Sequence, residues 1–256
     1  MSQISRSSFA AAMAPIVLAC LAVAAPPISP EAARELDRRR LLATAHYENG
    51  DFKAAAVEYR RCVELDKASA VDRFNLALVL TRATQYEEAM RTLDEAQRLD
   101  PKLRAVHYVR GIIYKRQSKY EKAIESLQQV VSGDQQCWGT RYNLGTCYKY
   151  LRQYDKARAQ FEAAVRIDPN HPSAHYQLII LARRAGDVER VARHTEIFER
   201  IKETIDESEK TPEALERSKF SGLIQSPKLT EELLPETAVR VSFTDVTAAA
   251  GLPSAK

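Results

Sequence analysis

The chain has 256 residues, enough for one or two domains with a substantial core. Its 8 Gly and 11 Pro argue against a loop-rich or β-rich fold over most of the length. The formal net charge of +4 is too small to indicate nucleic acid or an anionic membrane as a partner, and the four cysteines contain no C-x-x-C pair and no dense disulfide framework.

The N-terminal segment has the pattern of a secretory signal. A polar stretch carrying Arg6 precedes an uncharged run, Phe9–Ala25, that is short for a membrane span of about 20 residues. The run ends in Ala22–Ala24, an A-x-A cleavage pattern, and two prolines follow it. We expect residues 1–24 to be a cleaved signal peptide; the alternative is an uncleaved anchor.

The same uncharged run, Phe9–Ala25, also indicates a second route of processing. Val17–Cys20 reads VLAC and resembles the lipobox of bacterial lipoproteins, in which the cysteine becomes the lipidated first residue. The residues after Cys20 stay apolar, which is a departure from that pattern. Both routes predict an extracytoplasmic protein, periplasmic or secreted, and the lipobox route makes it a lipoprotein anchored through Cys20.

A period of 34 residues organises the next part of the chain. An alanine recurs in the second helix of each predicted unit, with a valine in the fifth: Ala55, Ala89, Ala123, Ala157 and Val191. A small residue recurs in the first helix, with an isoleucine in the fifth: Ala43, Ala77, Gly111, Gly145 and Ile179. An aromatic residue opens the second helix of the first four units: Phe52, Tyr86, Tyr120 and Tyr154. Apolar residues at helical spacing predict five helix pairs, at 36–69, 70–103, 104–137, 138–171 and 172–205.

This pattern resembles the tetratricopeptide repeat family, whose first helix carries an aromatic-Asn-Leu-Gly-x-x-Tyr motif. Phe74–Ala77 reads FNLA, and Tyr142–Gly145 reads YNLG with Tyr148 after it. Where the family often has Trp, this chain has Arg39, Arg73, His107, Arg141 and His175. The resemblance implies an all-α fold, a right-handed α-solenoid of antiparallel helix pairs that stack because one pair cannot bury its own apolar face. The fifth unit departs from the pattern, and we expect its second helix to continue to about Glu209 as a terminal cap.

The C-terminal part has a different character. Residues 206–237 are predicted to be a linker, and residues 238–256 begin with strand-like alternation. Phe243–Leu252, FTDVTAAAGL, resembles the opening of secreted β-propeller proteins with FG-GAP/VCBS repeats, a family that often ends in an ASPIC/UnbV domain. This resemblance predicts the start of a truncated β domain; the alternative is a disordered tail with a coincidental motif.

No pattern predicts catalysis, a cofactor or a metal. His171 and His175 are four residues apart and could share a helix face, but no third ligand is placed near them and Pro172 puts His171 outside the helix. No nucleophile-base signature and no Gly-rich phosphate loop is present. We therefore expect a protein that is not an enzyme.

The resemblance implies a concave face, lined by the first helices, that presents side chains to a bound peptide. The expected groove residues are Phe74, Asn75, Arg82, Tyr108, Lys115, Arg116, Tyr142, Asn143, Lys149, Tyr176, Gln177, Arg183 and Arg184, with Arg40 and Glu48 in the first unit. Rings would supply contact area, amides would hold a peptide backbone, and cations would select Asp, Glu or a C-terminal carboxylate. The alternative is packing for the rings and solubility for the basic residues.

The predicted function is an exported scaffold or adaptor that binds other proteins or peptides, with acidic segments as candidate ligands. No nucleic-acid partner is expected, and the membrane is expected only through a lipid or an uncleaved signal. The alternative is an N-terminal accessory domain of a larger secreted β-propeller protein that binds a surface.

Overall fold

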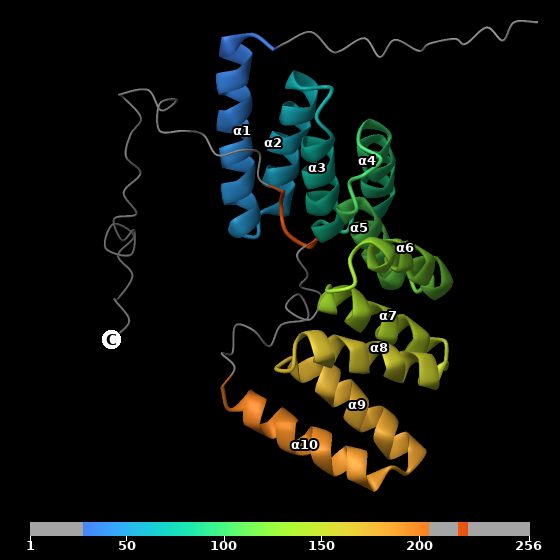
Figure 1. Cartoon of the computed structure of the whole chain (residues 1–256). Coiled ribbons are helices and arrows are strands. Elements are labelled where there is room, and N and C mark those ends of the chain that lie inside the picture. The colour runs from blue at the N-terminus through green and yellow to red at the C-terminus, as the bar shows by residue number, and fades with distance from the viewer. Residues whose placement is uncertain (1–27, 205–219, 225–256) are drawn as a thin grey trace, which may run out of the picture.

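The computed structural model describes residues 28–204 and 220–224 (Figure 1). The predicted signal, Cys20 and the predicted β segment lie outside these residues. The described part is all-helical, and its helices are α1 (Pro30–Glu48), α2 (Phe52–Leu65), α3 (Ala70–Arg82), α4 (Tyr86–Leu99), α5 (Ala105–Arg116), α6 (Tyr120–Gly133), α7 (Trp138–Tyr150), α8 (Tyr154–Ile167), α9 (Pro172–Ala185) and α10 (Val188–Lys202).

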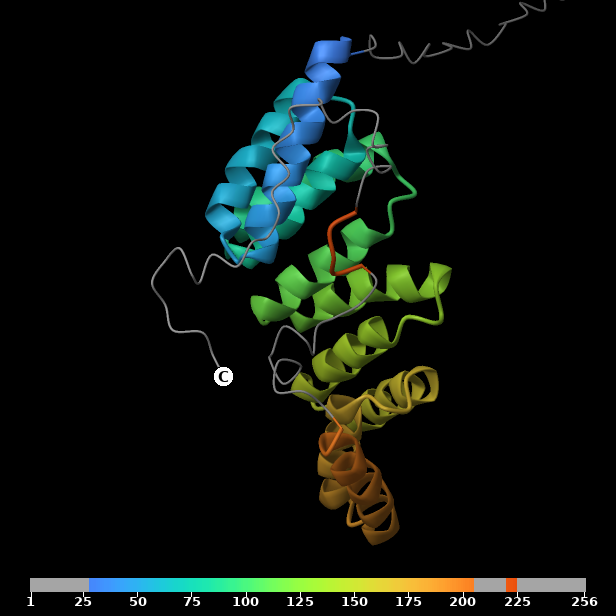
Figure 2. The same ribbon diagram turned by 90° about the vertical axis from the view of Figure 1, so that its left-hand side faces the viewer.

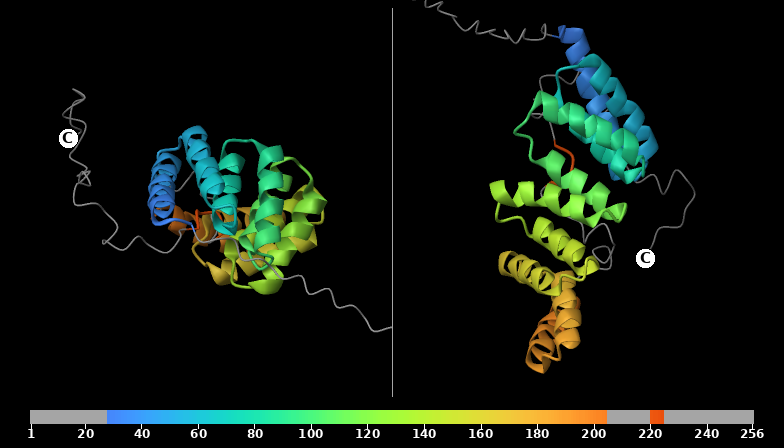
Figure 3. Two further views of the ribbon diagram at one scale, coloured as in Figure 1. Left: turned by 90° about the horizontal axis from the view of Figure 1, so that it is seen from above. Right: turned by 90° about the vertical axis from the view of Figure 1, so that its right-hand side faces the viewer.

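The helices form five antiparallel pairs that stack in chain order into a curved rod. In Figures 1 and 2 the helix axes turn progressively from α1 at one end to α10 at the other, and Figure 3 shows the curve from above. Each pair packs against the next, and the first helices of neighbouring units also touch, as in the contact of α3 with α5. The predicted α-solenoid is therefore confirmed.

Small residues allow the two helices of a pair to approach closely. A Cβ atom added to Gly111 would lie 2.7 Å from Cγ of Leu127, and one added to Gly145 would lie 2.7 Å from Cε1 of Phe161. Both distances are far below van der Waals contact, and core packing leaves little room to relax. The small residues of the 34-residue series are thus required by the interhelix distance.

The turn inside each pair also follows the repeat. A residue with left-handed backbone geometry recurs every 34 positions: Gly50 (φ 77°), Thr84 (φ 61°), Ser118 (φ 58°), Arg152 (φ 58°) and Gly186 (φ 70°). Glycine adopts this conformation without a Cβ penalty, whereas the three central units place a side chain there. The turn geometry is therefore constant although its residue type is not.

Polar residues stand where the family often has Trp, and in four units they join the two helices of a pair. In the second unit Arg73 donates from Nε to Glu95 Oε2 at 3.3 Å. Arg39 donates from Nη1 to Glu58 Oε2 at 2.8 Å. Arg141 donates from Nη1 to Gln160 Oε1 at 3.1 Å, and the Nδ1 atoms of His175 and His194 lie 3.0 Å apart. In the first, fourth and fifth units the partner is 19 residues along the chain, and in the second it is 22.

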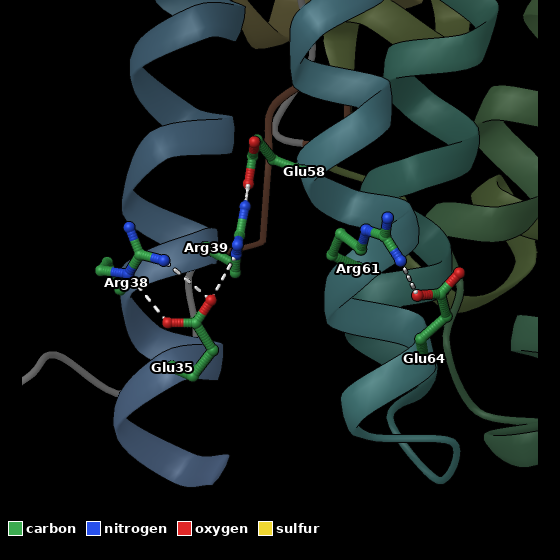
Figure 4. Close-up of polar contacts among 6 residues, drawn as sticks. All are labelled: Glu35, Arg38, Arg39, Glu58, Arg61 and Glu64. Carbon is green, nitrogen blue, oxygen red and sulfur yellow. Dashed lines mark hydrogen bonds and ion pairs between the residues drawn. The ribbon is translucent and has the colours of Figure 1, made fainter. Parts of the chain in front are cut away.

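In the first unit, the contact between Arg39 and Glu58 is part of a larger network of charged surface residues (Figure 4). Glu35 accepts hydrogen bonds from Arg38 and Arg39, and these lower the pKa of Glu35 to about 2. A separate pair, Arg61 and Glu64, lies on α2 at 2.8 Å, with both side chains more than half exposed. Arg39 therefore ties α1 to α2, whereas Arg61 and Glu64 join only neighbouring turns of one helix.

The ends of the stack differ from the predicted boundaries. α1 begins at Pro30, where the Ser29 side chain accepts a hydrogen bond from Ala32 N–H as an N-cap. α10 ends at Lys202 instead of continuing to about Glu209, and Ile201 is its single buried residue. With so little of its surface packed, the last helix lacks the tertiary support that would extend it. Among the described residues, no helix combines the length and apolar character needed to cross a bilayer.

A candidate peptide-binding groove

The four predicted aromatic groove residues are not equally accessible. Phe74 and Tyr108 are essentially fully buried, and Tyr142 is buried against the rings of Phe161 and His171. Tyr176 is 49% exposed on α9. The structure thus places Phe74 and Tyr142 in the packing between helices, and peptide contact through the aromatic series stays a prediction.

The predicted amides and lysines form pairs between neighbouring first helices. Lys115 Nζ donates to Asn143 Oδ1 at 2.5 Å, and Lys149 Nζ donates to Gln177 Oε1 at 2.7 Å. Both pairs join residues 28 apart in the chain. Asn143 Nδ2 also donates to Tyr108 OH at 3.2 Å and to Gly139 O at 2.8 Å. These amides are therefore engaged within the stack.

Asn75 binds a different kind of partner, the backbone of Ile224. Its Nδ2 donates to Ile224 O at 2.8 Å, and its Oδ1 accepts from Ile224 N–H at 2.8 Å. The short segment 220–224, red in Figures 1 and 2, lies beside α3 and α5. Its Phe220 ring lies 6.1 Å from the ring of Tyr108, and Leu223 and Ile224 pack against the core of the stack. Part of the predicted linker, residues 220–224, is thus docked against the stack.

A small pocket adjoins the docked segment. It is lined by Leu78, Thr81, Arg82, Tyr108, Val109, Ile112, Arg116 and Ser221. Arg116 Nη1 donates to Thr81 O at 3.5 Å across α3 and α5. The predicted residues Arg82, Tyr108 and Arg116 are therefore brought together at one place on the first-helix face.

The basic residues of the last two units lie farther along the same series of helices. Burial lowers the pKa of Lys149, which contacts Gln177 and lies 5.5 Å from the centre of the Tyr150 ring. Arg183 and Arg184 are exposed, and Arg184 lies 4.1 Å from the centre of the Tyr154 ring. Arg40, expected in the groove, instead pairs with the buried carboxylate of Asp72 on α3, while Glu48 is exposed at the end of α1.

Three histidines gather at the fifth unit. His171 is the N-cap of α9, and its Nδ1 accepts from Ala174 N–H at 3.1 Å. His175 Nε2 donates to Pro169 O at 2.9 Å. In the neutral ring its Nδ1 is therefore an acceptor, and the hydrogen bond to it comes from Nδ1–H of His194. Burial lowers the pKa of His171 and of His194 to about 4 and also lowers the pKa of His175. The arrangement is a capping and bridging cluster, and among the described residues no three His, Cys, Asp or Glu side chains are placed so that together they could hold a metal ion.

Sequence patterns missed the peptide side of this site. The uncharged run Phe220–Ile224 interrupts a polar stretch, which is a weak signal of burial. A second signal is the lack of a lysine partner for Asn75. Asn143 and Gln177 each follow a lysine by 28 residues and accept a hydrogen bond from it, whereas the residue 28 positions before Asn75 is Tyr47. Neither signal names the partner of Asn75.

Comparison with known proteins supports the repeat assignment. Two models of the tetratricopeptide repeat match the chain, one at residues 140–171 and one at 40–104 and 74–139. Together they span more than half of the sequence. Among curated proteins, none matches this sequence.

Solved structures share the fold at low sequence identity. MamA from Desulfovibrio magneticus RS-1 is 19% identical with a TM-score of 0.62, covering 70% of this chain and 99% of that one. PilF of Pseudomonas aeruginosa is 21% identical with a TM-score of 0.60, covering 66% and 78%. YrrB, described as a TPR protein with an unusual peptide-binding site, is 20% identical with a TM-score of 0.53, covering 67% and 88%. With the family models and the 34-residue register, these similarities show that the chain belongs to the tetratricopeptide repeat family, whose repeats are scaffolds for protein–protein interaction.

Proposed function

We propose that this protein is a non-catalytic adaptor that binds extended peptide segments of other proteins on the face formed by its first helices. The observation that carries the proposal is the pairing of the Asn75 side-chain amide with both backbone groups of Ile224. A side chain that reads N–H and C=O of one residue recognises an extended backbone whatever its sequence. YrrB, with the same fold, has a peptide-binding site.

The second part of the proposal is a preference for acidic segments near the fifth unit. Among the described residues, Lys149 on α7 has a neutral amide and a ring as its neighbours, and Arg183 is exposed on α9, the first helix of the next unit. Burial favours loss of the Lys149 charge, and a ligand carboxylate would restore it. Such charges select partners more than they add affinity.

Peptide binding to the full chain tests the electrostatic part. We expect a labelled peptide ending in Glu-Glu to bind more tightly than its Gln-Gln amide, and Lys149→Glu with Arg183→Glu to remove that preference. The matched control is Lys122→Glu with Lys156→Glu, the same charge change on α6 and α8. Equal affinity of the two peptides for the unaltered chain, at low and moderate salt, would refute the acidic preference.

Export is proposed from the N-terminal pattern. Mass spectrometry of the mature protein distinguishes its forms: a start at Ala25 supports a cleaved signal, and a lipidated Cys20 supports a lipoprotein. An unprocessed Met1 in cytoplasmic extracts contradicts both.

The resemblance at Phe243–Leu252 favours a second candidate function, in which the repeats are the accessory domain of a secreted β-propeller protein. An open propeller reading frame downstream of Lys256 would support it.

A further inference from the structure

Asn75 is chemically distinct from its counterparts in the other units. The residues at the same position of the 34-residue register are Leu41, Val109, Asn143 and Gln177. Asn143 and Gln177 each accept a hydrogen bond from a lysine 28 residues earlier, on the preceding first helix. At that distance before Asn75 the chain has Tyr47, which cannot supply an ammonium group. The Asn75 amide is therefore left for a ligand.

The surroundings of Asn75 select what that ligand can be. Asn75 is only 3% exposed, so its amide must be paired by whatever covers it. The adjoining wall is formed by Leu78, Val109 and Ile112, all buried apolar residues. A cationic side chain at this place would lose hydration without gaining an opposite charge, because Arg82 and Arg116 line the same pocket.

The segment now at this place satisfies both requirements. Phe220–Ile224 reads FSGLI and contains no charged residue. Phe220 lies against the Tyr108 ring, Leu223 and Ile224 pack on the core, and Ile224 offers its backbone N–H and C=O to Asn75. Gly222 is exposed, and an added Cβ would meet nothing within 4 Å. The backbone of Ile224 and the apolar residues at both ends of the segment therefore contact the stack, and Ser221 lines the adjoining pocket.

We propose that the surface between α3 and α5 is a binding site for a short, uncharged segment that begins with an aromatic residue and ends with aliphatic ones, and that Phe220–Ile224 is its internal competitor. The inference rests on the proposed function and adds to it the class of partner and the way access is regulated. A tethered segment has an effective concentration in the millimolar range, so a partner must outcompete it or act when it is withdrawn.

Hydrogen exchange of the full chain tests whether Phe220–Ile224 docks on Asn75. The Ile224 N–H donates to Asn75, so we expect its exchange in the unaltered chain to be slowed on the order of tenfold or more relative to Asn75→Ala. Gln177→Ala, the same register position in the fifth unit, is the matched control and leaves exchange at 220–224 unchanged. Equal exchange in the unaltered chain and in Asn75→Ala would overturn the assignment of Asn75.

Binding of a separate peptide tests whether the surface between α3 and α5 accepts a partner segment, and it does not depend on a variant of Asn75. The probe is a labelled synthetic peptide copying residues 217–227, and the host is the full chain with Phe220→Ser and Ile224→Ser, which leaves the helices unaltered. We expect this host to bind the probe at least about tenfold more tightly than the unaltered chain, because the internal segment no longer competes. A probe methylated at the Ile224 nitrogen lacks the donor to Asn75 and is expected to lose binding.

The outcomes separate the two proposals. If the serine host binds the probe no more tightly than the unaltered chain, internal competition is refuted. If the Glu-Glu peptide binds both hosts and the probe of residues 217–227 binds neither, the adaptor function is retained and this class of partner is refuted. If neither peptide binds either host, both proposals fall.

Discussion

Arg40 of α1 holds Asp72 of α3 through two hydrogen bonds, from Nε to Oδ1 at 2.9 Å and from Nη2 to Oδ2 at 2.6 Å. The Asp72 carboxylate is fully buried, and its backbone N–H is capped by Ser69. The pair joins the first helices of two successive units. A cation expected on the peptide-binding face is therefore part of the junction between repeats.

Removing the carboxylate should be costly because it leaves Arg40 without its buried partner. We expect Asp72→Ala to lower the free energy of unfolding by about 3 kcal/mol or more, measured by urea denaturation followed by circular dichroism. Glu64→Ala is the control, since its pair with Arg61 is exposed (Figure 4) and should contribute less than about 1 kcal/mol. Similar losses in the two variants would contradict the junction role.

Close approach of α7 and α8 predicts that a single methyl group at Gly145 is harmful. Gly145→Ala would press a Cβ against the Phe161 ring and should cost about 1–3 kcal/mol of unfolding free energy. Phe161→Leu removes the ring, so the double variant should lose clearly less than the sum of the two single losses. Additive losses in the denaturation series would show that the ring is not the obstacle.

The turn of the fourth unit stores backbone strain that glycine would relieve. Arg152 has φ 58° and an exposed side chain, so we expect Arg152→Gly to raise the thermal unfolding midpoint, with a gain of about 0.5–1 kcal/mol. Gly50→Ala is the reverse experiment at the same register position: φ is 77° and no atom lies within 4 Å of the added Cβ. A rise in the midpoint of Gly50→Ala would refute the strain argument.

Acid should weaken the fifth unit before the rest of the rod. His171 and His194 have pKa values lowered to about 4 in the folded chain, below the ordinary value of 6.5. The unfolded chain therefore binds more protons between these values, and stability should fall as the pH drops from about 6.5 to about 4. The sole tryptophan, Trp138, packs edge-on against His171, with the two ring centres 4.4 Å apart. Its fluorescence can therefore report the loss of structure at low pH.

His171→Asn with His194→Gln removes both titrating groups, and Asn can still cap α9. We expect this variant to lose much of the pH dependence over that interval. If its unfolding midpoint falls with acid as steeply as that of the unaltered chain, other groups are responsible.

The sequence predicted the repeat because packing within a unit depends on local spacing. Residues such as Ala55 and Gly145 recur in a fixed register, and each reports the same close contact between neighbouring helices. Turn geometry at Thr84 or Arg152 was not predicted, since their residue types do not favour positive φ. Periodicity therefore revealed the fold and left the less regular details open.

The arrangement of the proposed binding face was predicted only in part. A groove position can be counted along the register, but burial of Phe74 and Tyr142 depends on how closely successive units approach. The contact of Asn75 with Ile224 joins residues 149 apart, and no periodic pattern in the sequence predicts it. Sequence spacing identified the residues of the first helices, and three-dimensional packing determined which of their side chains remain accessible.

The docked segment also bears on the mechanics of the rod. Of the successive helices, α4 and α5 share the sparsest packing, so the junction of the second and third units is the natural place for bending. Phe220–Ile224 touches α3 through Asn75 and α5 through Tyr108, spanning that junction from its inner side. We therefore expect occupancy of the surface between α3 and α5 to change the stiffness of the superhelix at the junction of its second and third units.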